Sequence, residues 1–287
     1  MLNRSLLFVP ADKEKMLLKI NDLKADVVIL DLEDAISLNH KQFARDLVKK
    51  HFPNIKKPTI VRINSLETDE YSLDMQLVAE LAAFDSFRGI MLPKALSKNT
   101  IKQVSNRLQE VEKEAEINKK VPIIPLIESA LGIKNAYEIA SADERIIRLA
   151  FGGVDFVSDI DAQATLDEHE LLYARSEIII SSRSAGLDKP IDTVYVNFKD
   201  TEGFRSNCSY VKSLGFGGKL LIHPLQVNTA NQVFSPSKVE VEEAREIIDN
   251  VKANEHLGTF QLNGKMVDKP VIEKAKRILH DDQEINQ

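Results

Sequence analysis

Residues 27–36 read VVILDLEDAI, a run of apolar and β-branched residues that leads into Asp31, Glu33 and Asp34 within four positions. The apolar part is nearly continuous, which is typical of a strand buried on both faces of a parallel sheet. Acidic residues at the end of such a strand can cap a helix, face water or build a site. The rest of the chain has to decide among these roles.

Similar short apolar runs recur along the chain. Together with the first, they predict strands over residues 5–10, 27–32, 59–64, 89–93, 122–128, 146–152, 192–196 and 219–224. Amphipathic segments such as 12–24 and 100–120 lie between them and predict helices. About eight strand–helix units in a chain of 287 residues predict a (β/α)₈ TIM barrel. A doubly wound open sheet is the main alternative, but no G-x-G-x-x-G follows the first strand and no P-loop motif occurs.

The chain continues beyond the predicted eighth strand and helix. We therefore expect a barrel over residues 1–234 and a C-terminal extension over residues 235–287. The extension holds a charged helix (237–254), a turn-like Asn-Gly and a last helix (271–279). A barrel closes without it, so it is a cover, an oligomer contact or an active-site lid.

Composition narrows the class of protein. A net charge of -6 and a pI of about 5.6 argue against nucleic-acid binding, which needs a basic face. Trp is absent and aromatic residues make up 6%, so stacking platforms for single strands are not expected either. The single cysteine, Cys208, excludes a disulfide framework and a Cys-rich zinc site. No apolar run is long enough for a bilayer and the N-terminus lacks a signal-peptide core, so we expect a cytoplasmic protein without membrane partners.

Charged residues follow many of the predicted strands, and a barrel brings those strand ends to one rim. The set comprises Asp31, Glu33, Asp34, Arg62, Lys94, Glu128, Asp155 and His223. Clustered carboxylates repel one another unless a cation lies among them. Oxygen ligands and one imidazole without a thiolate favour Mg²⁺, or else Mn²⁺, over zinc. Glu128 and Asp155 would serve as the one or two protein carboxylates that Mg²⁺ typically takes.

Each of these residues also has a structural interpretation. An acid after a strand is often a helix cap or a solvated loop residue. A buried Arg62 needs an anion, which is either a protein carboxylate or a substrate carboxylate. Lys94 could extend to water, and His223 before Pro is as well explained as a structural histidine. The segment GFGGK (215–219) could bind phosphate, although a tight turn into the last strand is the better interpretation.

Taken in order, the motifs carry a family pattern. They are RSLLFVPAD, ADVVILDLEDAI, VRIN, GIMLPK, PLIESALGI, LAFGGVDF, IDTVY, GFGGKLLIHP and NGKMVD, and they span nearly the whole chain. The chain resembles the citrate lyase β-subunit family, which includes citryl-, malyl- and citramalyl-thioester lyases. VPAD departs from the family, which usually has Gly after the Pro, in a loop near the expected thioester site. The resemblance implies a TIM barrel, Mg²⁺ dependence and cleavage of a carbon–carbon bond in a 3-hydroxyacyl thioester.

The resemblance also implies roles for individual residues of the rim. Glu128 and Asp155 would bind the metal, and Glu128 would also contact the substrate. Arg62 would bind the substrate and act in catalysis. Glu33 and Asp34 would lie around the waters of the metal.

The C-terminal extension and the N-terminus supply the remaining candidates. Asp268 resembles the catalytic acid/base of members whose tail covers a neighbouring subunit's barrel, so a homotrimer is expected. Arg4, Phe8 and Lys13 are candidates, from their position, for binding the thioester carrier, either CoA or the prosthetic group of an acyl-carrier subunit. Two other functions stay open: a class II aldolase acting on a free hydroxy-keto acid, and a non-catalytic subunit that keeps the barrel.

Overall fold

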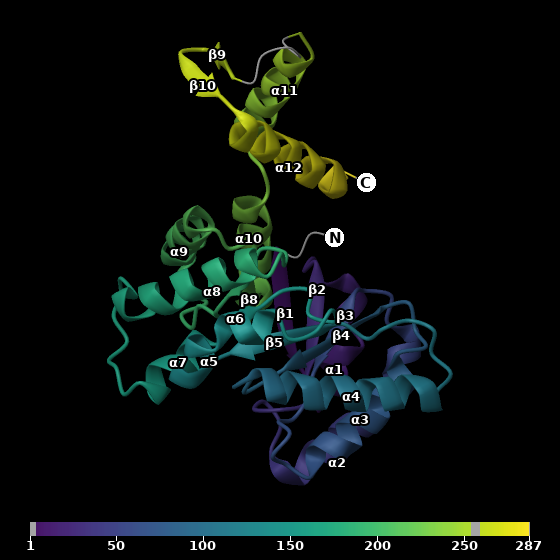
Figure 1. Ribbon diagram of the computed structural model, residues 1–287. Coiled ribbons are helices and arrows are strands. Elements are labelled where there is room, and N and C mark those ends of the chain that lie inside the picture. The colour runs from purple at the N-terminus through teal and green to yellow at the C-terminus, as the bar shows by residue number, and fades with distance from the viewer. Residues whose placement is uncertain (1–3, 254–258, 287) are drawn as a thin grey trace. The chain divides into compact units, whose positions relative to one another are not determined.

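A closed parallel barrel forms the larger of two compact units in the computed structural model, which describes residues 4–253 and 259–286. Each strand pairs in parallel with the next in chain order, and the last pairs with the first (Figure 1). This arrangement confirms the predicted TIM barrel. The strands are β1 (Ser5–Pro10), β2 (Val27–Asp31), β3 (Thr59–Arg62), β4 (Phe87–Leu92), β5 (Ile123–Ile127), β6 (Ala150–Phe151), β7 (Ile191–Asp192) and β8 (Gly218–Leu221).

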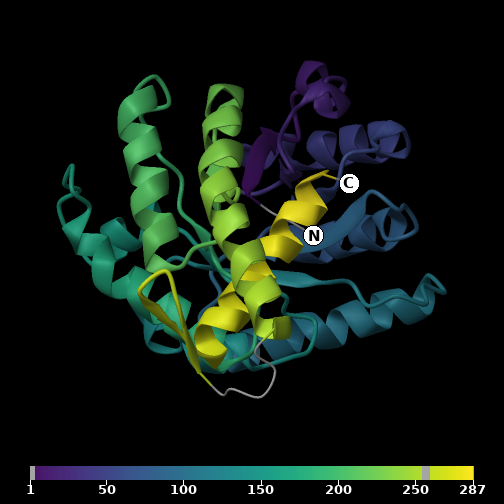
Figure 2. The ribbon, with the colours of Figure 1, turned by 90° about the horizontal axis from the view of Figure 1, so that it is seen from above.

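Helices follow the strands and surround the barrel (Figure 2). Several begin at a side-chain cap; the Ser97 hydroxyl, for example, accepts a hydrogen bond from the Thr100 N–H at the start of α4. The α-helices are α1 (Glu14–Leu17), α2 (Lys41–His51), α3 (Glu70–Leu81), α4 (Lys98–Glu114), α5 (Ala130–Lys134), α6 (Ala136–Ala140), α7 (Gly153–Asp159), α8 (Leu172–Ser184), α9 (Thr201–Leu214) and α10 (Val227–Phe234). Short 3₁₀ turns occupy η1 (Ile20–Asp22), η2 (Leu38–His40), η3 (Phe52–Asn54), η4 (His169–Leu171) and η5 (Pro224–Gln226).

The interior of the barrel is packed with apolar side chains. Strand side chains alternate between the two faces, so every second residue of a strand points to the barrel axis. The buried cluster formed in this way contains Leu6, Val27, Ile29, Ile60, Met91, Ile124, Leu126, Ala150, Ile191 and Leu220. The outer face of the same strands is apolar as well because helices cover it, which explains the continuous runs in the sequence.

Predicted and observed elements differ in length at several places; the helix expected over 100–120, for example, is α4 and ends at Glu114. The strands expected over 146–152 and 192–196 shrink to β6 and β7, each of two residues. After β7 the chain leaves the ladder, and the Thr193 hydroxyl instead accepts a hydrogen bond from the Gly153 N–H. The helix expected over 12–24 is broken into α1 and η1. Only part of its apolar residues face inward there: Leu17 and Ile20 are buried, whereas Met16 is exposed.

The second unit, described by itself, contains the C-terminal segment from Gln232 onward. Helix α11 (Lys238–Ala253) packs against α12 (Lys269–Asn286), and strands β9 (Phe260–Leu262) and β10 (Lys265–Val267) form an antiparallel hairpin. The Asn263-Gly264 turn has φ values of 50° and 76°, the left-handed pair that a two-residue hairpin turn requires. Within residues 4–253 and 259–286, no helix is both long and apolar enough to cross a bilayer.

A buried charge network links β7 and β8 to α8. Asp192 accepts hydrogen bonds from the Lys219 ammonium and from Arg175 Nε at 2.9 Å. All three side chains are fully buried. Burial alone would raise the pKa of Asp192, but the charges of Lys219 and Arg175 outweigh it and hold the pKa below its usual value. Lys219 of the GFGGK segment therefore belongs to the wall of the barrel, in agreement with the turn interpretation.

Replacing Asp192 by Asn should destabilise the barrel, because Lys219 would lose its buried counter-ion. Breaking a buried pair from one side costs about 3–5 kcal/mol. We expect the free energy of unfolding, measured by urea titration, to fall by about 3 kcal/mol. The control Glu80→Gln removes the exposed partner of Lys49 and should change it by less than about 1 kcal/mol. Equal effects of the two variants would contradict this account.

Candidate active site

The charged layer of the barrel follows from the strand alternation. Asp31 lies two residues after the interior Ile29, Arg62 two after Ile60, and Glu128 two after Leu126. A residue two positions beyond an interior residue also points toward the barrel axis. The apolar core therefore gives way to charged side chains at the C-terminal ends of the strands, where TIM barrels carry their active sites.

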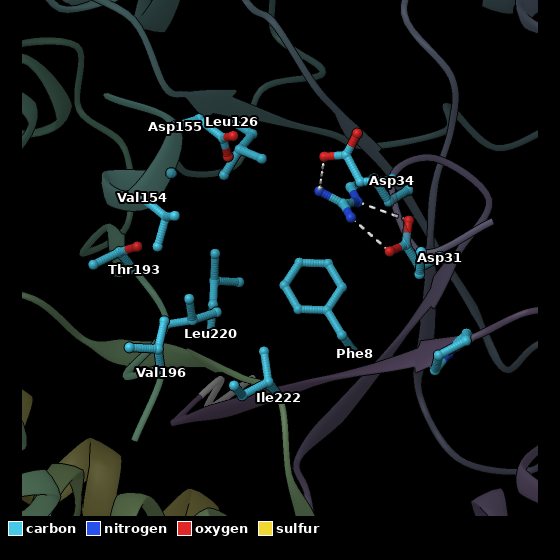
Figure 3. Close-up of a pocket in the computed structure, with 15 residues that line it drawn as sticks. Phe8, Asp31, Asp34, Leu126, Val154, Asp155, Thr193, Val196, Leu220 and Ile222 are labelled. Atoms are coloured by element: carbon cyan, nitrogen blue, oxygen red, sulfur yellow. Dashed lines mark hydrogen bonds and ion pairs between the residues drawn. The ribbon is translucent and has the colours of Figure 1, made fainter. Parts of the chain in front are cut away.

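A cavity of about 470 Å³ opens at this end of the barrel. Figure 3 shows that its lining is two-sided, with Asp31, Asp34 and Asp155 on one side and apolar side chains on the other. The apolar side is made by Phe8, Val154, Val196, Leu220 and Ile222, among others. A cavity with one charged wall and one apolar wall suits a ligand that is itself charged at one end.

Arg62 is the centre of the charged wall. Its Nε and Nη2 donate to the two oxygens of Asp31 at 2.8 and 2.5 Å. Its Nη1 lies 3.1 Å from Glu33 Oε2 and 3.6 Å from Asp34 Oδ2. The guanidinium also stacks over the Phe8 ring, 4.8 Å from the ring centroid. The protein carboxylate that the sequence left open as a partner for Arg62 is thus Asp31.

Negative charge exceeds positive charge around this guanidinium. Burial raises the pKa of Glu33 to about 8; Arg62 opposes this shift, and Asp34 and Glu128 add to it. Burial likewise raises the pKa of Glu128 to about 7, against a hydrogen bond from the Lys94 N–H and with a further contribution from Asp155. Carboxylates that push each other toward the protonated form would be stabilised by an added cation.

Two backbone features hold Glu128 in place. The Lys94 N–H donates to Glu128 Oε1 at 2.6 Å, and Lys94 adopts a left-handed φ of 50°, which is uncommon for a residue with a Cβ. On the other side, a Cβ at Gly152 would lie 2.9 Å from Glu128 Oε2. Glycine at position 152 therefore leaves the space that this carboxylate occupies.

Asp155 faces the same region from the first turn of α7. Burial raises its pKa and Asp34 raises it further, whereas Arg62 lowers it. Among the described residues, no group of three or more His, Cys, Asp or Glu side chains encloses a metal position. Mg²⁺ needs no such enclosure, since it commonly takes one or two carboxylates and completes its shell with water and substrate. The donor set of Glu128 and Asp155, all oxygen and raised in pKa, fits that ion.

The structure does not bring every predicted residue to the cavity. Arg4 precedes β1, so it lies at the opposite end of the barrel, where it pairs with Asp26 at 2.7–2.9 Å. The expectation that Arg4 binds the carrier is not supported by this position. Lys13 follows β1 on the cavity side and is exposed, in contact with Asp12.

His223 and Asp268 both act as helix caps. His223 Nδ1 accepts a hydrogen bond from the Leu225 N–H, and its ring stacks on Phe198. These contacts agree with the interpretation of His223 as a structural histidine. Asp268 Oδ1 accepts from the Val271 N–H at the start of α12 in the C-terminal unit. Its predicted catalytic role stays a prediction.

Sequence reasoning missed a polar network behind the charged wall. Lys41, Asn64 and Asp74 are buried and hydrogen-bonded to one another or to the β2–α2 loop. In the sequence, Lys41 and Asp74 look like ordinary charged positions of solvent-facing helices. Asn64, directly after VRI, was the one signal available, because it follows Arg62 by two residues.

Comparison with known proteins places the chain among enzymes. The family model "HpcH/HpaI aldolase/citrate lyase" matches residues 4–224. Citrate lyase subunit beta of Haemophilus influenzae is 37% identical over 287 residues, covering 97% of this chain and 96% of that protein. A (3S)-malyl-CoA thioesterase of Cereibacter sphaeroides is 34% identical, covering 96% and 93%.

Solved structures agree with the sequence matches. The CitE protein of Mycobacterium tuberculosis, in complex with magnesium, acetoacetate and coenzyme A, superposes with a TM-score of 0.78 at 27% identity. The match covers 98% of both chains. The predicted family and its enzyme class, the carbon–carbon lyases, are thereby confirmed. The chain belongs to the HpcH/HpaI aldolase/citrate lyase family.

Proposed function

We propose that this chain is a Mg²⁺-dependent carbon–carbon lyase that cleaves a 3-hydroxyacyl thioester into a keto acid and an acyl thioester. The observation that carries the proposal is the group of acids beside Arg62: Asp34 and Asp155 line the cavity with Arg62. The carboxylate of Glu128 is close enough for Asp155 to raise its pKa and for Arg62 to lower it. The magnesium and coenzyme A in the similar Mycobacterium tuberculosis protein support the same choice of ion and carrier.

The residues of the charged wall divide the work on the substrate. Glu128 and Asp155 would hold Mg²⁺, which supplies a Lewis acid for the substrate's hydroxyl and carboxylate oxygens. Arg62 Nη1, which lies beside Asp34 at the cavity, would donate to the substrate carboxylate or to the oxyanion that forms there. Asp31 keeps this guanidinium oriented by its two hydrogen bonds. Glu33 and Asp34 would accept hydrogen bonds from water around the ion.

The apolar wall and the C-terminal unit would provide the rest. Phe8, Leu220 and Ile222 would exclude water from the reacting carbon and contact the acyl chain. Asp268 would protonate the departing enolate carbon, or take a proton from the acyl thioester in the reverse direction. We assign Asp268 to the barrel of a neighbouring subunit in a homotrimer, with the extension as its cover. Lys13 is the candidate for a carrier phosphate, on CoA or on an acyl-carrier subunit.

A panel of citryl-, malyl- and citramalyl-CoA tests the reaction. With Mg²⁺, we expect one of them to yield a keto acid and an acyl-CoA, and chelation should abolish the yield. Glu128→Gln should lose both turnover and calorimetric Mg²⁺ binding, because it removes an ionised ligand. The control Glu110→Gln, at an exposed position of α4, should keep both.

The products separate the proposal from its competitors. Intact hydroxy acid with free CoA would indicate a thioesterase, like the Cereibacter sphaeroides relative. Turnover of a free hydroxy-keto acid would indicate the aldolase alternative. A wild-type chain that binds no Mg²⁺ in calorimetry would favour a non-catalytic subunit.

Asp268→Asn tests the acid/base assignment without removing the cap of α12. Asn is about as good a helix cap as Asp, so the free energy of unfolding should change little. The Asn carboxamide is neither acidic nor basic enough to exchange a proton at this step, so turnover should fall by ~10²–10⁴-fold with Mg²⁺ affinity unchanged. The companion Asp268→Ala should lose turnover and also ~1 kcal/mol of stability. Full turnover by Asp268→Asn would restrict this residue to the cap.

A further inference from the structure

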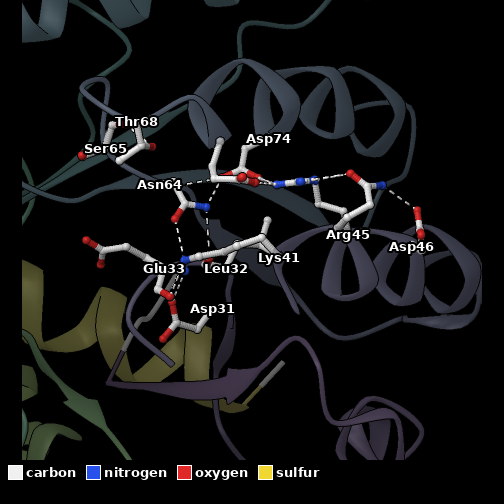
Figure 4. Close-up of polar contacts among 12 residues, drawn as sticks. Asp31, Leu32, Glu33, Lys41, Arg45, Asp46, Asn64, Ser65, Thr68 and Asp74 are labelled. Carbon is white, nitrogen blue, oxygen red and sulfur yellow. Dashed lines mark hydrogen bonds and ion pairs between the residues drawn. The ribbon is translucent and has the colours of Figure 1, made fainter. Parts of the chain in front are cut away.

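The ammonium of Lys41 is buried behind the charged wall. Lys41 is the first residue of α2 and is 8% exposed. Its Nζ donates to the main-chain carbonyls of Leu32 and Glu33, both at 2.7 Å, and to Asn64 Oδ1 at 2.6 Å (Figure 4). These three acceptors use all three protons of the ammonium.

The position is an unfavourable one for a lysine. A cation in the first turn of a helix opposes the helix dipole. Burial lowers the pKa of Lys41, although nearby carboxylates, Asp74 first among them, oppose this shift. Neither the stability of α2 nor solvation of the ammonium therefore favours a lysine at position 41. Its three hydrogen bonds are the remaining interaction that favours it.

Lys41 is itself fixed by residues of the next strand–helix unit. Asn64, just after β3, donates from its Nδ2 to the Leu32 carbonyl at 3.0 Å and to Asp74 Oδ2 at 2.7 Å. Asp74, fully buried on α3, also accepts from Arg45 Nη1 at 3.0 Å. Since Arg45 follows Lys41 by one turn of α2, both cations of this helix act on the same network. Asn64, which accepts one hydrogen bond from Lys41, is thus itself held in place by Leu32 and Asp74.

The segment that Lys41 holds carries two carboxylates of the site. The Glu33 N–H donates to Asp31 Oδ1 at 2.9 Å, so Asp31 holds the main chain from the cavity side while Lys41 holds its carbonyls from behind. Figure 4 shows the Glu33 side chain extending away from the Lys41 ammonium. On that side, Glu33 and Asp34 reach Arg62 at 3.1 and 3.6 Å.

We propose that Lys41 is a positioning residue, whose ammonium fixes the main chain at Leu32 and Glu33 and thereby aims the Glu33 and Asp34 carboxylates at Arg62 and the metal site. It touches neither substrate nor ion. The metal part of this inference rests on the proposed function, whereas the fixing of the loop does not.

Hydrogen exchange tests the loop directly, on the protein without added metal. In Lys41→Met, backbone amides of residues 32–36 should exchange about ten-fold faster, as expected for the loss of one or two hydrogen bonds. The matched control is Arg145→Met, which removes another buried cation. Arg145 precedes β6 and pairs with Glu112 of α4, so its loss should leave the exchange rates of residues 32–36 unchanged. Unchanged exchange at 32–36 in Lys41→Met would overturn the proposal.

A double-mutant cycle tests the connection to the site. Alone, Lys41→Met and Glu33→Gln should each weaken calorimetric Mg²⁺ binding by ~10–100-fold. Lys41 also positions Asp34, so the double variant can bind more weakly than either single variant, but its loss of affinity should be clearly smaller than the product of the two single losses. Multiplying effects would overturn the proposal, because a purely structural Lys41 would act independently of Glu33.

Two further outcomes have defined readings. If Lys41→Met does not fold, Lys41→Arg replaces it: the charge is kept, but a planar guanidinium cannot aim three donors at these acceptors, so faster exchange at 32–36 is still expected. A folded Lys41→Arg with wild-type exchange would overturn the proposal. If the wild type binds no Mg²⁺, the proposed function fails, and the exchange experiment alone decides the role of Lys41.

Discussion

The ion pair between Arg62 and Asp31 is the interaction on which the arrangement of the site depends. Two hydrogen bonds join the ends of β2 and β3 inside the barrel and fix the plane of the guanidinium. The same Asp31 accepts the Glu33 N–H, so one carboxylate sets both the cation and the start of the acidic loop. A pair of this kind is stable in a buried place only with its remaining polar atoms satisfied. Here the loop provides those partners, because Glu33 and Asp34 face Arg62 Nη1 and the Glu33 N–H donates to Asp31.

The charges around this pair do not balance within the protein. Arg62 faces three carboxylates, those of Asp31, Glu33 and Asp34. Two more lie nearby: Glu128 raises the pKa of Glu33, and Asp155 raises the pKa of Glu128. Lys94 Nζ is exposed and lies 3.9 Å from Glu33, too far for a strong interaction. An arrangement that is costly by itself and relieved by a cation is a common property of ion-binding sites. We therefore expect this end of the barrel to attract a cation even before a substrate binds.

The sequence predicted the barrel and the charged rim well because both depend on local patterns. Continuous apolar runs mark strands buried on both faces, and a polar residue two positions past an interior one must face the axis, as Arg62 and Glu128 do. Properties set by distant contacts were missed. Arg4 is close in sequence to the cavity-lining Phe8 but precedes the strand, so it lies at the end of the barrel opposite the cavity, where it pairs with Asp26. Lys41 and Asp74 are buried only because α2, α3 and two loops pack together. The local sequence pattern does not predict that tertiary contact.

Lys94 combines a strained backbone conformation with a hydrogen bond that orients Glu128. Its left-handed backbone costs about 1–2 kcal/mol for a residue with a Cβ. The same geometry presents the Lys94 N–H to Glu128, so the carboxylate that we propose as a metal ligand is oriented in advance. Glycine at position 94 would present the same N–H to Glu128 without this cost. What the strained backbone retains is therefore the lysine side chain, whose exposed ammonium lies 3.9 Å from Glu33 and adds a mobile positive charge to the rim.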